Sequence, residues 1–220
     1  MNVILSVFLT KNIDPQRNIK WPIDYSILQP FLDSVSNYKS IIFTDELDGE
    51  SNIIKIDESS MITNPYFKRW ELYSNYLKSN LNIDYVWVVD STDVVLLKDP
   101  FNFMKKKTIY CGFAEPGETL GSLWMINNHP FHYKWLINNK EKLFLNDGVV
   151  GSDRKTMINL CDNILDIYSK SIVSKKELLF DLSAFNYLVY NDTKINLITD
   201  NIVSDFKKYD LNSSAIWRHK

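Results

Sequence analysis

The sequence has no long apolar run, no large excess of charge of either sign and only two cysteines. No apolar segment is long enough to cross a bilayer, and residues 1–9 lack the basic segment and cleavage site of a signal peptide. The net charge of -2 gives no electrostatic reason to expect nucleic acid or an anionic membrane as a partner. Cys111 and Cys161 lie in apolar segments, so we expect reduced core residues of a cytoplasmic protein, with one disulfide between them left open.

The 220 residues, 45% of them hydrophobic, are enough for one well-buried core and one compact domain. No internal repeat, low-complexity tract or linker interrupts the chain. Strand and helix patterns alternate through the first half, which predicts an α/β domain with a mostly parallel central sheet flanked by helices. Strands are expected at residues 2–9, 40–44, 52–56, 85–89, 94–97, 108–114, 148–150, 195–198 and 215–217. Helices are expected at residues 25–38, where Pro30 delays the start, and at 65–77, 131–143, 154–168 and 180–190.

Two acids directly follow the most apolar of these strands. Residues 85–89 (YVWVV) have the composition of a strand buried on both faces, and Asp90 and Asp93 come next. Ligands of open α/β sheets bind beyond the carboxyl ends of the strands. Two carboxylates there repel each other unless a cation lies between them, and oxygen ligands favour Mg²⁺, Mn²⁺ or Ca²⁺. The spacing therefore predicts a divalent-metal site, the alternative being a turn with two solvated acids.

Other polar residues are expected at the same edge of the sheet. Thr10, Asp14 and Arg17 belong to the polar loop that leaves the carboxyl end of the first strand, so they are candidates for nucleotide contact. The alternative is an ordinary Asp-Pro turn with a solvated arginine. Lys68 or Arg69, on the helix at residues 65–77, either reaches a base or diphosphate or lies on a solvated helix face.

Two further segments permit more than one interpretation. Residues 115–123 contain two glycines and a proline, so they form either a loop that closes over a substrate or a plain surface loop. His129 and His132 lack the spacing of a zinc site, so we expect them at the surface or at a helix start. Trp124 and Trp217 are either core residues or platforms for a glycan.

Four motifs occur in order along the chain: VVDSTDVV, LNDGVVG, FDLSAFN and WRHK. Together they resemble nucleotide-sugar-dependent glycosyltransferases of the GT-A fold. The chain is similar to small soluble transferase domains, including those encoded by some large DNA viruses, and to retaining family-8-like enzymes. The resemblance implies a single GT-A (Rossmann-like) domain over residues 1–220, with a nucleotide-binding half at about 1–100 and an acceptor and sugar half at about 101–220.

The resemblance also assigns roles around the two acids. It implies that Asp93 ligates the metal, that Asp90 approaches the ribose or a metal-bound water or ligates the metal itself, and that His219 completes the shell. Ser91 or Thr92 is a further candidate for nucleotide contact, and the resemblance places Lys220 where it neutralises the leaving diphosphate. The cofactors implied are Mn²⁺, or Mg²⁺, and a nucleotide-sugar with UDP as the expected carrier. An imidazole ligand favours Mn²⁺ over Ca²⁺.

Catalytic candidates depend on the stereochemistry. The resemblance implies that Asn146 and Asp181 face the donor sugar, and it alone favours retention of the anomeric configuration. If the reaction retains, Asp181 and Asn146 are the nearest polar candidates for a base or nucleophile. If it inverts, Asp147 or Glu115 is the candidate base. Leu182 stands where the family usually has glutamine, which removes one polar contact near the sugar.

The function expected is transfer of a sugar from a nucleotide-sugar to a glycan or other hydroxyl acceptor, in the cytoplasm (the host cytoplasm if the protein is viral). The alternative is a catalytically inactive sugar- or nucleotide-binding module of the same fold. A phosphatase with an aspartyl nucleophile is disfavoured, because VVDSTDVV places its second acid one position too late. Whether the chain is one domain of a longer protein stays open.

Overall fold

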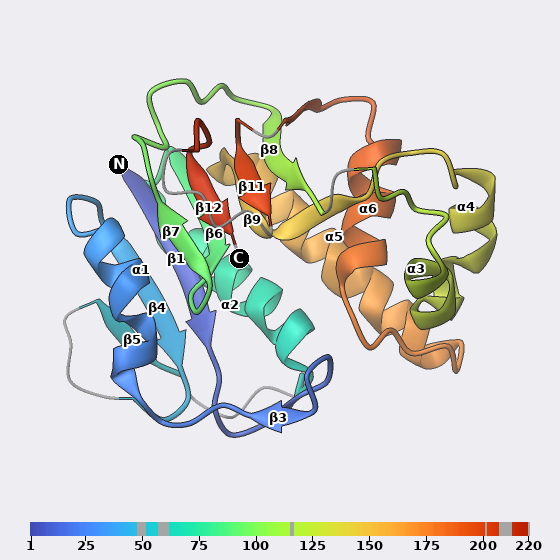
Figure 1. The fold of residues 1–220 in the computed structure, drawn as a ribbon, viewed down its shortest axis with the longest axis horizontal. Coiled ribbons are helices and arrows are strands. Elements are labelled where there is room, and N and C mark those ends of the chain that lie inside the picture. The colour runs from blue at the N-terminus through green and yellow to red at the C-terminus, as the bar shows by residue number, and fades with distance from the viewer. Residues whose placement is uncertain (48–51, 57–61, 115–116, 201, 207–212, 220) are drawn as a thin grey trace.

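A seven-stranded sheet forms the centre of the computed structural model, which describes residues 1–220 except 48–51, 57–61, 115–116, 201, 207–212 and 220 (Figure 1). The strand order is β10-β8-β9-β6-β1-β4-β5. Only β9 runs antiparallel to its neighbours β6 and β8, and the other pairs in this sheet are parallel. The strands are β1 (Asn2–Phe8), β4 (Ser40–Thr44), β5 (Ile53–Lys55), β6 (Tyr85–Asp90), β8 (Thr108–Phe113), β9 (Leu145–Asp153) and β10 (Asn196–Thr199).

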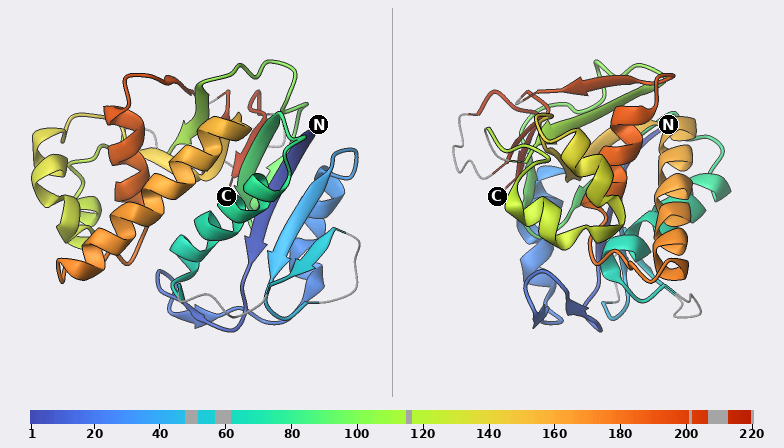
Figure 2. Two further views of the ribbon diagram at one scale, coloured as in Figure 1. Left: turned by 180° about the vertical axis from the view of Figure 1, so that it is seen from behind. Right: turned by 90° about the vertical axis from the view of Figure 1, so that its right-hand side faces the viewer.

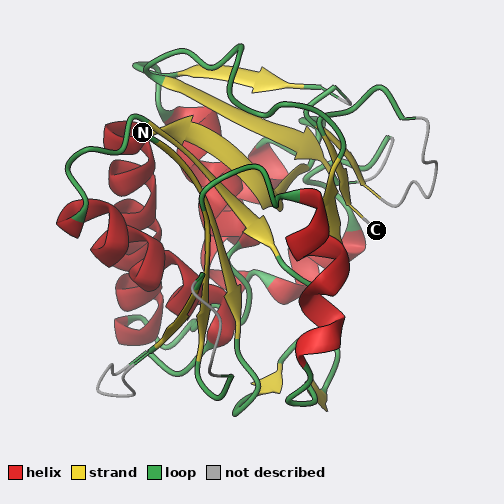
Figure 3. Cartoon of the chain, turned by 90° about the vertical axis from the view of Figure 1, so that its left-hand side faces the viewer, coloured by secondary structure: helices red, strands yellow, loops and turns green. Residues whose placement is uncertain are grey.

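Helices cover one face of this sheet, and a short helix with a second sheet covers the other (Figures 2 and 3). The first face packs against α2 (Pro65–Ser79), α5 (Arg154–Val173) and α6 (Leu182–Asn191). The second face packs against α1 (Gln29–Ser34) and the three-stranded sheet of β11 (Ser204–Phe206), β12 (Trp217–His219) and β7 (Val94–Leu96). The expected α/β class with a mostly parallel sheet between helices is confirmed.

Local sequence explains where the two long helices begin. The Asn64 side chain accepts a hydrogen bond from the Tyr66 amide, and Pro65 occupies the first turn of α2. Asp153 caps α5 by accepting from the Thr156 amide. Each helix then buries residues at helical spacing, and α2 and α5 pack on each other and on the sheet; the buried set includes Phe67, Trp70, Tyr73, Leu77, Met157, Leu160, Cys161 and Ile164.

Several elements differ from the sequence-based expectation. The expected strand at 148–150 is the middle of β9, which is nine residues long. The expected helix at 131–143 is wrong in extent: a 3₁₀ turn at Pro130–His132 leads into α4 (Tyr133–Asn138), and a bridge pairs Thr119 with Leu143. A short helix, α3 (Leu123–Asn128), follows the expected loop, whose residues 115–116 lie outside the described part. The N-terminal helix begins as a 3₁₀ turn at Tyr25–Leu28, and Pro30 lies in the first turn of α1.

Smaller features complete the comparison. The polar loop after β1 contains a hairpin of β2 (Ile13–Asp14) and β3 (Ile19–Lys20). Cys111 and Cys161 are buried free cysteines, as expected. Within the described residues, no helix has the length and apolar character needed to cross a membrane.

The two internal histidines bear out one expected position, a helix start, and correct the other, the surface. His129 and His132 were expected at the surface or at a helix start, and both do precede helical turns, but both are buried. His129 Nδ1 lies 2.9 Å from the Met125 carbonyl, and His132 Nδ1 lies 2.9 Å from Ser183 Oγ. Burial lowers the pKa of each imidazole to about 4, so both rings are neutral core groups at pH 7.

We predict that Asp153→Ala lowers the free energy of unfolding by about 2 kcal/mol, because α5 loses its cap. The same carboxylate also accepts hydrogen bonds from the Thr156 hydroxyl and the Lys107 amide. The matched control is Asp166→Ala, which removes only an exposed pair with Lys170 on the same helix and should cost about 0.5 kcal/mol or less. Urea denaturation followed by circular dichroism compares the two; equal losses would contradict the capping role.

Candidate functional site

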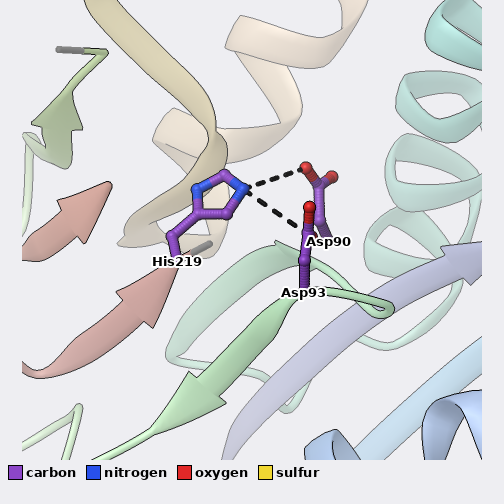
Figure 4. A group of neighbouring side chains, drawn as sticks. All are labelled: Asp90, Asp93 and His219. Atoms are coloured by element: carbon purple, nitrogen blue, oxygen red, sulfur yellow. Dashed lines mark ion pairs between the residues drawn. The ribbon is translucent and has the colours of Figure 1, made fainter. Parts of the chain in front are cut away.

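Three side chains from two distant parts of the chain form one cluster (Figure 4). Asp90 ends β6, Asp93 immediately precedes β7, and His219 ends β12. Because β12 pairs antiparallel with β7 and places His219 opposite Val94, the imidazole comes to lie beside Asp93. His219 Nε2 lies 3.6 Å from Asp90 Oδ2 and 3.7 Å from Asp93 Oδ1. One ligand atom from each residue lies within 4.8 Å of the other two, so the three residues are able to share one ion.

The surroundings of the triad (Asp90, Asp93 and His219) fit a cation. Asp93 Oδ1 is buried and accepts no hydrogen bond within the described residues. Such an atom is costly unless a cation or another partner meets it. Gly148 of β9 leaves the space open, since a Cβ there would contact both the His219 ring and Asp90 Oδ2. Two carboxylates with an imidazole form a donor set suited to Mn²⁺ or Mg²⁺, and the imidazole favours Mn²⁺.

A buried guanidinium organises the carboxylates beside the triad. Arg69 of α2 is 9% exposed, and its Nη1 donates to Asp90 Oδ1 at 2.9 Å. Its Nη2 lies 3.0 Å from Asp147 and 2.7 Å from Asp181. Trp70 Nε1 also donates to Asp181, at 2.5 Å. Asp181 occupies the expected N-cap position of α6, but its carboxylate binds these two side chains instead of a helix amide.

The crowding of acids changes their protonation. Burial raises the pKa of Asp147 well above its usual range, the charge of Asp181 raises it further, and Arg69 opposes both. Loss of water also raises the pKa of Asp90, where Arg69 lowers it and the charge of Asp93 raises it again. Both carboxyl groups therefore hold a proton more readily than ordinary aspartates, and a bound cation would favour their ionised forms.

Two cavities meet at the triad. The smaller, of about 150 Å³, lies over the ends of β1 and β6 and is lined on its outer side by Asp14 and Trp21 of the β2–β3 hairpin region. The larger, of about 610 Å³, extends toward α3 and α6. Asp90 and Asp93 line both cavities, and His219 lines the larger. A ligand that spans the two would therefore pass the candidate metal position.

The candidates expected from the first loop separate into two groups. Arg17 lines both cavities, and its Nη2 lies 3.3 Å from Asp93 Oδ2. Asp14 lines the smaller cavity and accepts from the Gln16 and Arg17 amides. Thr10 does not line either cavity: it is buried, and its amide and hydroxyl donate to Asp45. The structure therefore gives Thr10 a supporting position in the loop.

Of the remaining candidates, three lie at the larger cavity, one lies at the smaller cavity and two fall outside the described residues. Asn146, Asp147 and Asp181 all line it, and Asn146 Oδ1 accepts from the Gly148 amide at 2.7 Å. Ser91 lines the smaller cavity, where its hydroxyl donates to the Val7 carbonyl. The expectations for Lys220 and Glu115 fall on residues outside the described part of the chain.

Some cavity residues were missed from the sequence. Tyr66 lines both cavities, and its hydroxyl donates to Asp14 Oδ1 at 2.9 Å. Its position three residues before Arg69 on one helix was the signal that the two share a face. Trp124 lines the larger cavity, whereas Trp217 is fully buried, which corrects its expected alternative as a glycan platform.

Comparison with known proteins adds nothing to this geometry: no protein-family model matches the chain, and no curated protein matches it.

We predict that Arg69→Met lowers the free energy of unfolding by about 3–5 kcal/mol at pH 7, because three carboxylates lose their shared cation. Lys78→Met is the matched control on the same helix; its exposed pair with Asp162 should contribute about 1 kcal/mol or less. Denaturant titrations of the three proteins measure the difference.

The same comparison at lower pH tests the cause. A carboxyl group whose pKa is higher in the folded than in the unfolded state binds more protons when folded, so acid stabilises the fold as the pH falls through the folded pKa. Without Arg69 the pKa values of Asp90 and Asp147 rise further. The deficit of Arg69→Met should therefore shrink between pH 7 and pH 5; a constant deficit would contradict the electrostatic explanation.

We predict that the protein depletes the electron paramagnetic resonance signal of free Mn²⁺ and that Gly148→Ala weakens this binding about 10–100-fold, because the added methyl group displaces Asp90 and His219. Gly121→Ala is the control, since its Cβ would meet Lys140 and not the triad. It should lower thermal stability and leave Mn²⁺ binding intact. A wild-type protein that leaves the signal unchanged would exclude the metal site.

Proposed function

We propose that this chain is a metal-dependent glycosyltransferase of the GT-A fold, which moves a sugar from a nucleotide-sugar to a hydroxyl acceptor. UDP is the expected nucleotide, and retention of the anomeric configuration is the expected stereochemistry. The observation that supports the proposal most is the triad of Asp90, Asp93 and His219 at the junction of two cavities. The cavities offer separate places for a nucleotide and for a sugar with its acceptor.

Sugar transfer requires that the negative charge of the departing nucleoside diphosphate be stabilised. The bond between the anomeric carbon and the diphosphate oxygen breaks and the diphosphate keeps the electron pair. The acceptor oxygen forms the new bond and passes its proton to the departing diphosphate, or to Asp147 if the reaction inverts. A metal ion held by the triad would supply positive charge that stabilises the departing diphosphate. Arg17, whose guanidinium lies against Asp93, can bind the same diphosphate from the outer side.

The carboxylates of the larger cavity have distinct tasks in this proposal. Arg69 and Trp70 hold Asp181 in position, and the Gly148 amide holds the Asn146 side chain on the same wall of the cavity. Asp181 and Asn146 can therefore accept hydrogen bonds from hydroxyl groups of the donor sugar. Asp147 also lines that wall. Its pKa is raised, which makes its carboxylate a stronger base toward the hydroxyl proton of the sugar acceptor. It is the candidate base if the reaction inverts.

We predict that UDP binds in the presence of Mn²⁺ and that chelation with EDTA or the substitution Asp93→Asn abolishes the binding. Asp162→Asn is the control, because that carboxylate pairs with Ser74 and Lys78 of α2 and lines neither cavity. Isothermal titration calorimetry with UDP and with GDP measures both the affinity and the base preference. UDP binding that persists unchanged in EDTA would contradict the role given to the metal.

A second measurement separates an enzyme from an inactive binding module. Incubation with UDP-hexoses and Mn²⁺ in the absence of an acceptor should release free hexose slowly, with water taking the place of the acceptor. Binding of UDP without hydrolysis of any donor in the panel would favour the inactive module.

A further inference from the structure

An aromatic wall closes the larger cavity on the side of α3. Trp124, Phe144 and Phe180 line it. The Trp124 ring stacks on Phe144 with 6.3 Å between centroids and an interplanar angle of 22°, and it lies 5.5 Å from Phe180. Phe144 and Phe180 are 4% and 6% exposed, whereas Trp124 is 37% exposed. Trp124 is therefore the member of the wall that offers open ring surface.

The indole is held in place before any ligand arrives. Ser122 caps α3 by accepting from the Met125 amide, which fixes the first turn, where Trp124 lies. The His129 ring meets the indole edge-on at 5.4 Å, and its Nδ1 lies 2.9 Å from the Met125 carbonyl. Because the imidazole is buried, it stays neutral and acts as a packing group. A rigid platform loses little conformational entropy when a ligand binds.

Polar groups line the same cavity as the aromatic wall. Asn146, Asp147, Asp181 and Glu118 also line it. A pyranose has an apolar face of C–H groups and a rim of hydroxyl donors, which complement an open indole and several oxygen acceptors. An anionic ligand would meet the carboxylates unfavourably, and a lipid chain would offer no hydrogen-bond donor to the polar groups of the cavity. The chemistry that fits is a neutral polyhydroxylated ring.

The position of the wall separates it from the donor. Trp124 and Phe144 line only the larger cavity, whereas Asp90 and Asp93 line both. A diphosphate at the triad would place its nucleoside toward the smaller cavity and its sugar at the start of the larger one. Figure 1 shows α3 at the right-hand side of the molecule, whereas the β2–β3 hairpin beside the smaller cavity lies at the lower edge. The wall is then free for the acceptor.

We infer that the acceptor is a saccharide whose pyranose ring stacks on Trp124. The acceptor role rests on the proposed transferase function, but saccharide binding to Trp124 does not and can be measured alone.

The first test uses the unmodified protein and a panel of methyl hexopyranosides and methyl N-acetylhexosaminides. Limited oxidation with N-bromosuccinimide, followed by peptide mass spectrometry, reports the accessibility of each indole. At least one glycoside should protect Trp124 and leave Trp135, which does not line the cavity, unprotected. Glycerol at equal concentration should protect neither. Absence of protection by every glycoside in the panel would overturn the inference.

The second test compares Trp124→Leu with Trp135→Leu by saturation-transfer NMR of the protecting glycoside. Trp135 packs on His132 and Tyr187 in the neighbouring helices, so its substitution controls for loss of an indole. Trp124→Leu should weaken glycoside binding by at least about tenfold, and Trp135→Leu should not. Equal binding by both variants would overturn the inference.

Titration of the same proteins with UDP and with GDP keeps the two proposals apart. UDP binding with no glycoside on Trp124 would overturn the saccharide acceptor and leave the transferase proposal standing. Glycoside binding at Trp124 without binding of UDP or GDP would support the saccharide site and overturn the transferase.

Discussion

The interaction on which the site depends is the set of ion pairs made by Arg69. One buried guanidinium binds Asp90 at the end of β6, Asp147 in β9 and Asp181 before α6. Without it, these acids would repel one another in a poorly hydrated space, and the segments that carry them would separate. The two oxygens of Asp90 also have different partners: Oδ1 binds Arg69, whereas Oδ2 points toward His219. A structural contact thus orients an oxygen for a cation.

The three-stranded sheet positions the third member of the triad, His219. β7 starts directly after Asp93 and pairs with β12, so backbone hydrogen bonds determine how far His219 lies from the acid. The same sheet covers one face of the central sheet through Trp217, which packs on Trp87 at 5.7 Å between ring centroids. The geometry of the triad is therefore coupled to a core contact, and a change in that packing would alter the ligand positions.

Sequence patterns predicted the parts of this arrangement that depend on local order. The apolar run before Asp90, the cap at Asn64 and the alternation of strands and helices each follow from neighbouring residues. The proximity of His219 to Asp93 was expected only from the resemblance, because nothing local indicates that β12 pairs with β7. The burial of His129 was not predicted for a similar reason, because part of what covers its ring is Phe180, which is distant in the sequence, together with Trp124.

The reversed direction of β9 has a consequence for how the site is assembled from the chain. In a wholly parallel sheet, only residues that follow a strand reach the ligand-binding edge. β9 runs the other way, with Val149 opposite Val89, so residues at its beginning lie beside the end of β6. Asn146 and Asp147 thus belong to a strand and not to a loop, between Leu145, which pairs with Phe113 of β8, and Val149, which pairs with Val89 of β6. Insertions in the neighbouring loops would change the shape of the larger cavity without moving Asn146 and Asp147.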